Sequence, residues 1–440
     1  MTSAGTPAER ERLLIVGVNY APEPTGSAPY TAGLAETLAA SGHPVDVVTG
    51  VPHYPSWRVD PAYRWCLRRR EHRNGVQVHR LRHYVPGRQS ALTRIGWEAS
   101  FLANAGLLRT TAPAAVIASM PSLGGGVYAA SVAQRHGSPL AVVVQDLVGQ
   151  ATTQSGLRGG SRVSGLASGI ERRVLLQADL VAVVSPAFRD QLSAYGVPAD
   201  RIVDFPNWTH IGGTSASRTD TRRELGWGEG QFVVLHTGNM GLKQDLGNVV
   251  EAARLHGDGD LGHPSPLFVL MGNGNQRSQL ERQAAGLANV AIVDGVDAAT
   301  YPAVLAAADL LLVNERASVG DMSLPSKLTS YLAAGRPVLA AVGNAGACAG
   351  FLAGTAGAAR LVPPGEPRLL LDAVLELRDD EAARHRMSGR AADYASQHLG
   401  LAAAQQRIAE LAERLLHCRG GVPAQAGSPE RVSAAGTSRR

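Results

Sequence analysis

The chain has 440 residues, of which 45% are hydrophobic and 18% are charged, and its formal net charge is +5. This length and composition are typical of a folded protein with two domains, and they exclude a collagen-like or low-complexity chain. No run of eighteen apolar residues occurs and residues 1–12 are polar, so we expect neither a membrane span nor a secretory signal. Three cysteines without metal-ligand spacing favour a cytoplasmic protein, with peripheral contact to the inner face of the membrane as an option.

Short apolar runs, each followed by a helical stretch, predict buried parallel strands. The first series comprises residues 13–18, 45–50, 114–119, 141–146 and 180–185. The second series comprises residues 232–238, 267–272, 289–295, 310–315 and 337–342. Because strands alternating with helices build a parallel sheet, the sequence predicts an α/β protein with two Rossmann-like domains.

A stretch rich in Gly, Ser, Thr and charge, residues 206–231, separates the two series and is typical of a linker. An amphipathic helix is predicted over residues 399–418 from its spacing of Leu, Ile and Ala. The predicted segments are a flexible start at 1–12, a first domain at 13–209, a second domain at 210–398, the helix at 399–418 and a disordered tail at 419–440.

Residues 58–94 form a basic segment with ten arginines and only two acidic residues, Asp60 and Glu71. Such a segment can bind phosphate, anionic lipid or nucleic acid. Few aromatic residues interleave with these arginines, which argues against a surface for stacking bases. A non-catalytic binder of nucleic acid or membrane remains an alternative, and steep salt-dependent binding to oligonucleotides would support the nucleic-acid form of it.

Lysine occurs only at Lys243 and Lys327 among 42 basic residues. Lys243 follows a predicted strand that ends in Gly238 and Asn239, with Gly241 between them and the lysine. Flexible backbone, exposed amide groups and an ammonium group together make an anion site. A surface lysine without a ligand is the alternative interpretation.

Lys327 stands at the start of a predicted apolar helix, directly after Ser323, Pro325 and Ser326. Either serine can cap the helix, and the helix dipole together with Lys327 favours a negative group in front of it. An ordinary capped helix explains this motif equally well when it is taken alone. Two such motifs, each with one of the two lysines, predict a diphosphate held between them.

Other loops carry weaker signals. Gly26 precedes a helix and allows a ligand to approach the backbone, and Gln145 and Asp146 end a strand at the same predicted crevice. The GNGNQR motif at 272–277 lacks the third glycine and the downstream acid of a dinucleotide site. The GDGD turn at 257–260 lies at the amino end of a strand, so we do not expect a metal there.

Several of these motifs together resemble one known family. The segments are NYAPEPTGSAPYT, VTGVPHYPSW, PNWT, HTGNMGLKQDLGNVVEAA, LMGNGNQRSQLE and LPSKLTSYLAAGRPV, and they run through nearly the whole predicted folded chain. The sequence resembles glycosyltransferase family 4, the retaining enzymes of GT-B fold, and within it the colanic acid and exopolysaccharide subgroup. The resemblance implies an acceptor domain and a nucleotide-sugar domain that face a cleft, with the last helix crossing back to the first domain.

The resemblance also implies roles for individual residues. Asn239 and Lys243 would meet the donor diphosphate with Ser326 and Lys327 opposite, and Gly26 would lie beside the transferred sugar. The predicted catalytic residues are Lys243, Lys327, Asp146 and Gly26. The predicted donor-binding residues are Gly238, Asn239, Lys243, Gly272, Gly274, Gly295, Ser323, Ser326, Lys327, Leu328 and Ser330. The predicted acceptor-binding residues are Asn19, Tyr20, His53, Tyr54 and Gln145.

Two departures from the family pattern concern the sugar. Many members carry two glutamates in the last motif, and this chain has Met322 and Ser330 at those places. Glu315 and Asp321 are nearby but out of register. The histidine common after the strand at 141–146 is replaced by Gln145 and Asp146. We therefore expect phosphate binding to follow the family more closely than sugar positioning does.

The expected activity is transfer with retention from a nucleoside-diphosphate sugar, with GDP slightly favoured over UDP. The acceptor would be a polyprenyl-linked saccharide or a small soluble metabolite such as an antibiotic precursor. No cofactor or metal is expected, because fixed cations would stabilise the leaving diphosphate. A nucleotide-sugar 2-epimerase of the same fold is the alternative enzyme, and it would turn over its substrate without an acceptor.

Overall fold

The computed structural model describes residues 11–87, 90–147, 160–209, 211–256, 265–317, 325–344 and 346–418. Some sequence predictions therefore fall on residues outside these ranges. They concern most of the flexible start, the disordered tail at 419–440, the GDGD turn at 257–260, and Asp321, Met322 and Ser323.

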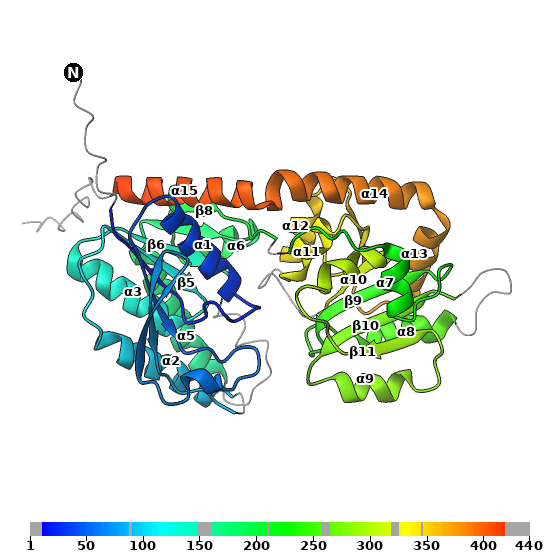
Figure 1. The fold of residues 1–440 in the computed structure, drawn as a ribbon, viewed down its shortest axis with the longest axis horizontal. Coiled ribbons are helices and arrows are strands. Elements are labelled where there is room, and N and C mark those ends of the chain that lie inside the picture. The colour runs from blue at the N-terminus through cyan, green and yellow to red at the C-terminus, as the bar shows by residue number, and fades with distance from the viewer. Residues whose placement is uncertain are drawn as a thin grey trace, which may run out of the picture.

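The first domain is built on an eight-stranded sheet with the strand order β3-β4-β2-β1-β5-β6-β7-β8 (Figure 1). All neighbouring strands are parallel except β3 and β4. The central strands are buried because helices cover both faces, which is why they read as continuous apolar runs. The strands are β1 (Leu13–Val16), β2 (Val45–Gly50), β3 (Arg68–Arg73), β4 (Val76–Leu81), β5 (Ala115–Met120), β6 (Leu140–Val144), β7 (Leu180–Val183) and β8 (Ile202–Asp204).

The helices of this domain cover the sheet and supply the rest of its core. Trp97 and Phe101 of one of them are 2% and 0% exposed. The helical segments are α1 (Ala28–Ala40), η1 (Pro61–Tyr63), α2 (Ala91–Gly106), α3 (Leu123–His136), α5 (Gly160–Gln177), α6 (Phe188–Ala194) and η2 (Ala199–Arg201).

Most arginines of the basic segment are exposed, but Arg80 is not. Part of the segment forms the antiparallel hairpin of β3 and β4 at one edge of the sheet. Arg80 is only 1% exposed and donates from Nε to Glu71 Oε2 at 2.8 Å. The sequence RRREHR of β3 has no apolar alternation, because an edge strand facing water does not need one. Periodicity therefore missed β3, and Arg80 is a core residue.

The second domain has a six-stranded parallel sheet with the order β11-β10-β9-β12-β13-β14. The apolar runs predicted all of its strands except β14, and β11 is a half-buried edge strand. The strands are β9 (Val233–Asn239), β10 (Leu267–Asn273), β11 (Val290–Val293), β12 (Leu310–Asn314), β13 (Val338–Ala341) and β14 (Ala359–Val362). The helices are α7 (Arg218–Glu224), α8 (Gly247–His256), α9 (Arg277–Ala284), α10 (Tyr301–Ala307), α11 (Lys327–Ala333), α12 (Ala347–Ala353) and α13 (Pro367–Asp379).

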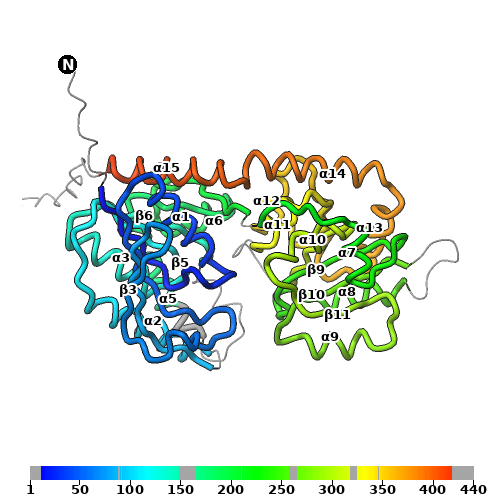
Figure 2. Tube along the Cα trace, in the orientation of Figure 1, coloured from blue at the N-terminus to red at the C-terminus, as the bar shows by residue number. Residues whose placement is uncertain are grey.

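The last helices run along both domains, as Figures 1 and 2 show. α14 (Glu381–Tyr394) packs on the second domain and continues through the π-helical turn η3 (Ala395–Leu399). After Gly400, α15 (Leu401–His417) buries Ile408 and Leu415 in the core of the first domain. The predicted crossing helix is thus confirmed. Across the described ranges, no helix combines the length and the apolar character that a bilayer span requires.

Candidate active site

Lys327 is the first residue of α11, and its ammonium group is held at the end of β9. Its Nζ lies 3.1 Å from Nε2 of His236. Gly238 follows on the same strand, and a Cβ built on it would stand 3.6 Å from that Nζ. The φ of Gly238 is 106°, in the region that favours glycine. The lysine therefore lies directly against exposed backbone at the carboxyl end of the strand.

His236 is fully buried and fixes the orientation of this lysine. Its Nδ1 lies 3.1 Å from the carbonyl oxygen of Leu312, so Nδ1 carries the proton and Nε2 accepts from Lys327. Burial holds the pKa of His236 well below its usual value, and the charge of Lys327 acts in the same direction. Burial also lowers the pKa of Lys327 to about 7, against a raising effect of Glu315.

Glycines bring the loops after β9 and β10 into backbone contact. Gly238 pairs with Gly272 across the two strands. A Cβ on Gly272 would overlap the carbonyl oxygen of Gly238, and one on Gly274 would overlap that of Met240. Both glycines are thus required for packing. At Gly295, after β11, the nearest atom to such a Cβ is 4.0 Å away, so this position is open.

The loop that carries Lys243 is clamped by Asn314, which sequence reasoning missed. Asn314 ends β12 and is 1% exposed. Its Nδ2 donates to the carbonyl oxygens of Gln244 and Asp245 at 2.8 and 3.0 Å, and its Oδ1 accepts from Asn248 at 2.8 Å. A buried amide at the end of the run LLLVN was the available signal. Lys243 itself is exposed on this clamped loop.

Glu315 follows Asn314 and lies in the electric field of both lysines. Burial raises the pKa of this half-buried carboxyl to about 7, while Lys327 and then Lys243 lower it. The backbone N–H of the next residue, Arg316, donates to the carbonyl oxygen of Lys243 at 2.9 Å. Two cations 84 positions apart in the sequence therefore act on one carboxyl group. The sequence placed Glu315 near the site without assigning it a role.

Asp146 of the first domain faces this group from across the domains. It follows β6, and burial raises its pKa to about 7 while the charge of Lys243 lowers it. Burial, Asp146 and Glu23 all raise the pKa of Tyr54. Gln145, beside Asp146, exchanges two hydrogen bonds with Asn207 at 3.0 and 2.8 Å. The amide of Gln145 is thereby engaged within the protein.

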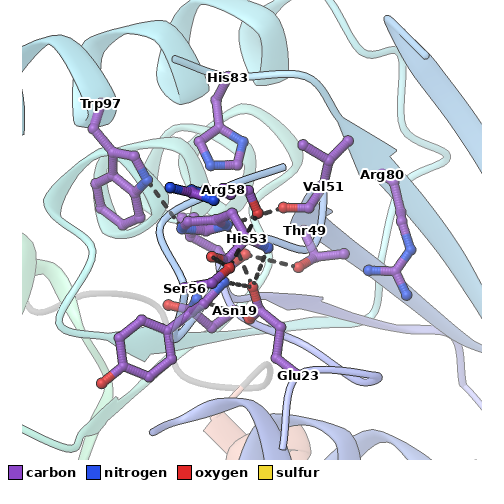
Figure 3. A network of polar contacts seen from close by, with 12 residues as sticks. Asn19, Glu23, Thr49, Val51, His53, Ser56, Arg58, Arg80, His83 and Trp97 are labelled. Atoms are coloured by element: carbon purple, nitrogen blue, oxygen red, sulfur yellow. Dashed lines mark hydrogen bonds and ion pairs between the residues drawn. The ribbon is translucent and has the colours of Figure 1, made fainter. Parts of the chain in front are cut away.

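In the first domain, Glu23 holds the loop of His53 and Tyr54 that follows β2, and Figure 3 shows its contacts with His53. Glu23 is 5% exposed, and its Oε1 accepts from the backbone N–H groups of His53 and Tyr54, both at 2.8 Å. Its Oε2 accepts from Asn19 Nδ2 at 2.8 Å. Trp97 donates its indole N–H to Nε2 of His53 at 3.3 Å. Glu23 was not among the predicted residues, yet it holds three of them, Asn19, His53 and Tyr54, in place.

The predicted acceptor residues have unequal access to a ligand. Tyr20 and His53 are 1% and 3% exposed, so neither presents a side chain to an acceptor in this structure. Tyr54 is half-buried, and its ring lies 3.2 Å from a Cβ built on Gly26, whose φ is 70°. A pocket of about 450 Å³ borders this loop. It is lined by Pro22, Glu23, Pro24, Pro52, His53, Tyr54, Ser56, Arg58, Val59, Asp60 and Pro61.

The remaining predicted donor residues surround the start of α11. Ser326 is exposed at the N-cap position, but its side chain makes no capping hydrogen bond, so the predicted capping by Ser326 is wrong. Its backbone is already helical there, with φ −57° and ψ −23°. Leu328 and Ser330 are 0% and 2% exposed, so both lie on the buried side of α11. Among these residues, Lys327 is the one whose charged group reaches the strand end.

Comparison with known proteins agrees with this architecture. Residues 25–208 match the family described as glycosyl transferase 4-like domain, and residues 217–394 match glycosyl transferases group 1. A protein of Escherichia coli K12 named as the colanic acid biosynthesis glycosyl transferase WcaI is 33% identical over 338 residues, which cover 74% of this chain and 81% of that protein.

Solved structures share the fold at lower identity. Sucrose-phosphate synthase from Thermosynechococcus elongatus superimposes with a TM-score of 0.71 at 19% identity, over 93% of this chain and all of that one. Anabaena HepE in complex with UDP-glucose gives 0.65 at 19% identity, over 92% of this chain and all of that one. The domain matches and the 33% identical relative establish that the chain belongs to glycosyltransferase family 4 and is a transferase of GT-B fold.

Proposed function

We propose that the protein transfers a sugar from a nucleoside diphosphate, with retention of configuration, and that Lys243 and Lys327 bind the diphosphate. The observation that carries this proposal is that Lys327 lies against His236 at the end of β9 while the residue after Glu315, Arg316, donates to the backbone of Lys243, so both lysine segments meet at the carboxyl ends of β9 and β12. An anion placed there gains two cations and the backbone of Gly238. A single ammonium group that already has a partner inside the protein would stabilise the anion less.

In the proposed reaction, negative charge grows on the leaving diphosphate as the sugar bond breaks. Lys327 is already oriented by His236, so little reorganisation is needed when that charge appears. The acceptor attacks from the side of the phosphates, and a phosphate oxygen takes its proton. We assign Asp146 of the first domain, whose carboxyl lies in the electric field of Lys243, the role of orienting a sugar or acceptor hydroxyl. Both fixed cations act where a divalent metal would otherwise act, so the proposed reaction requires no metal.

The identities of the donor nucleotide and of the acceptor are proposed from the resemblance and from the names of similar proteins. Anabaena HepE was solved with UDP-glucose, and its identity of 19% supports only the fold. We keep GDP slightly ahead of UDP, as the resemblance to the exopolysaccharide subgroup implies. The relative named for colanic acid biosynthesis supports a saccharide acceptor. We place that saccharide on a polyprenyl carrier ahead of a small soluble metabolite.

Donor binding provides the direct test. We expect GDP or UDP to raise the melting temperature of the wild-type protein, and we expect the Lys243→Ala/Lys327→Ala variant to lose that shift. Transfer in the presence of EDTA tests metal independence, and the anomeric configuration of the product, read by NMR, tests retention. Wild-type turnover by the double variant would refute the phosphate role. Consumption of the nucleotide sugar without any acceptor would instead support the epimerase.

A further inference from the structure

The outward face of α2 is apolar. Its exposed positions are Leu92, Ile95, Ala99, Ala103 and Gly106, at helical spacing, and none carries a charge. The inward face buries Trp97 and Phe101 in the domain core. A helix that is apolar on both faces normally lies inside a protein or at a membrane surface, whereas the outward positions of α2 are exposed.

Neighbouring residues extend this apolar face. The exposed fractions are 87% for Trp65, 76% for Leu67 and 73% for Leu107. The segments of Leu67 and Leu107 meet because Asn104 of α2 donates to the carbonyl oxygen of Leu67, and Arg68 donates to that of Leu107. Trp65 precedes Leu67 by two residues. Tyr84 is 48% exposed, and its ring packs beside Gly96 of α2. We call the surface formed by these residues and the outward positions of α2 the α2 face.

The charge around the α2 face has one sign. Residues 61–109 contain ten arginines and two acidic residues, Glu71 and Glu98. Glu71 is paired with Arg80, and Glu98 accepts from Ser122 Oγ and from the backbone N–H of Gly124, at 2.7 and 2.9 Å. Both carboxylates are engaged within the domain. Arg68, which donates to the carbonyl oxygens of Asn104 and Leu107, and the other exposed arginines of β3 supply positive charge beside the α2 face.

We propose that the α2 face binds an anionic phospholipid bilayer. Exposed Trp and Leu side chains insert at the interface between headgroups and acyl chains, and arginines pair with lipid phosphates. A protein partner would have to match an apolar surface surrounded by cations alone. The charge pattern therefore favours lipid as the occupant.

The α2 face is also linked to the proposed acceptor site. Trp97, on the inward side of α2, donates to His53, which lines the 450 Å³ pocket. Docking through α2 would thus bring that pocket close to the bilayer surface, where a polyprenyl carrier presents its sugar. The inference deepens the proposed function by assigning the acceptor to a membrane. Because vesicle binding is measured without donor or acceptor, it can fail independently of glycosyl transfer.

Sedimentation with lipid vesicles tests the α2 face on the full chain. We expect binding to vesicles of phosphatidylcholine that contain phosphatidylglycerol, and little binding to phosphatidylcholine alone. Leu92→Glu/Ile95→Glu should reduce binding at least about tenfold, because it places two charges in the apolar contact. Arg70→Ala should reduce it about fivefold. The matched control is Leu369→Glu on α13, since Leu369 is 44% exposed and Ile95 is 43% exposed.

Donor-induced melting shifts verify that the variants are folded and keep their nucleotide site. The lipid proposal is overturned if the wild type ignores anionic vesicles or if the double variant binds them equally well. It is also overturned if light scattering finds a dimer that the double variant dissociates while vesicles are ignored. In that case a second copy covers the α2 face. Oligonucleotide binding lost in the same variants, without vesicle binding, would identify nucleic acid as the occupant instead.

Discussion

The two domains present different chemistry where they face each other. The second domain presents two ammonium groups and exposed glycine backbone on its side. Lys327 is oriented by His236, and Asn314 holds the loop that carries Lys243. On the side of the first domain, Glu23, Gln145 and His53 already use polar side-chain atoms in hydrogen bonds within the domain. We therefore expect the second domain to bind its ligand by charge and the first by the shape of its loops.

This difference has a physical reason. A diphosphate always carries negative charge, so cations held in advance can stabilise it without reorganising. The proposed saccharide acceptor reacts through a hydroxyl group, which needs loops of defined position rather than charge. A mutation should therefore reduce turnover on the donor side and stability on the acceptor side.

The largest expected effect comes from Lys327→Ala. Loss of one charge-stabilising donor should reduce turnover about a hundredfold or more. The melting temperature should not fall, because burial lowers the pKa of Lys327 to about 7 and folding therefore disfavours its charged form. Steady-state kinetics measure the loss. Arg254→Ala, which removes a cation from an exposed pair with Glu251 on α8, should retain wild-type turnover.

On the acceptor side, Glu23→Ala should reduce stability rather than turnover. It leaves the backbone N–H groups of His53 and Tyr54 without their acceptor, at a cost of about 1–3 kcal/mol in the free energy of unfolding of the first domain. Urea denaturation followed by tryptophan fluorescence measures it. Glu36→Ala is the matched control, because that carboxylate is 29% exposed and lies 3.6 Å from Arg73. Equal stability of the two variants would contradict the organising role of Glu23.

His236→Leu sharpens the donor side, because it removes the acceptor of Lys327 but keeps an apolar side chain in the core. We expect kcat/KM for the donor to fall about tenfold, less than for loss of the lysine itself. His236→Gln should restore most of that loss, since an amide oxygen can accept from the ammonium group. Failure of glutamine to improve on leucine would mean that His236 serves packing alone.

The pH dependence of the donor side gives the smallest effect. With a pKa of about 7, free Lys327 loses its proton as the pH rises through neutrality. We expect kcat/KM for the donor to fall about threefold between pH 6.5 and 7.5, because this constant reports the free enzyme. Glu315 titrates in the same range, and His236 stays neutral throughout. Lys327→Arg should abolish the decline, because guanidinium stays protonated. A flat wild-type profile would contradict a deprotonating lysine.

The sequence predicted the α/β class, two parallel sheets and the crossing helix because buried strands and amphipathic helices leave apolar periods. It missed β3, β8 and β14, which are short or lie at sheet edges, where solvent removes the need for an apolar pattern. It also missed β4, whose buried valines alternate with polar residues inside the basic segment. It also identified Lys243 and Lys327 as unusual, and their shared phosphate remains a prediction. Asn314 and Glu23 escaped because a single buried polar residue has no period.

By itself, the sequence determined which segments form the two sheets and which two residues can supply an ammonium group. Only the tertiary structure decided that His236 faces Lys327, that Asn314 holds the loop of Lys243, and that the outward positions of α2 are exposed. Periodicity is a local property of neighbouring residues. The pairing of a buried polar atom with its partner depends on which distant strands the fold brings together.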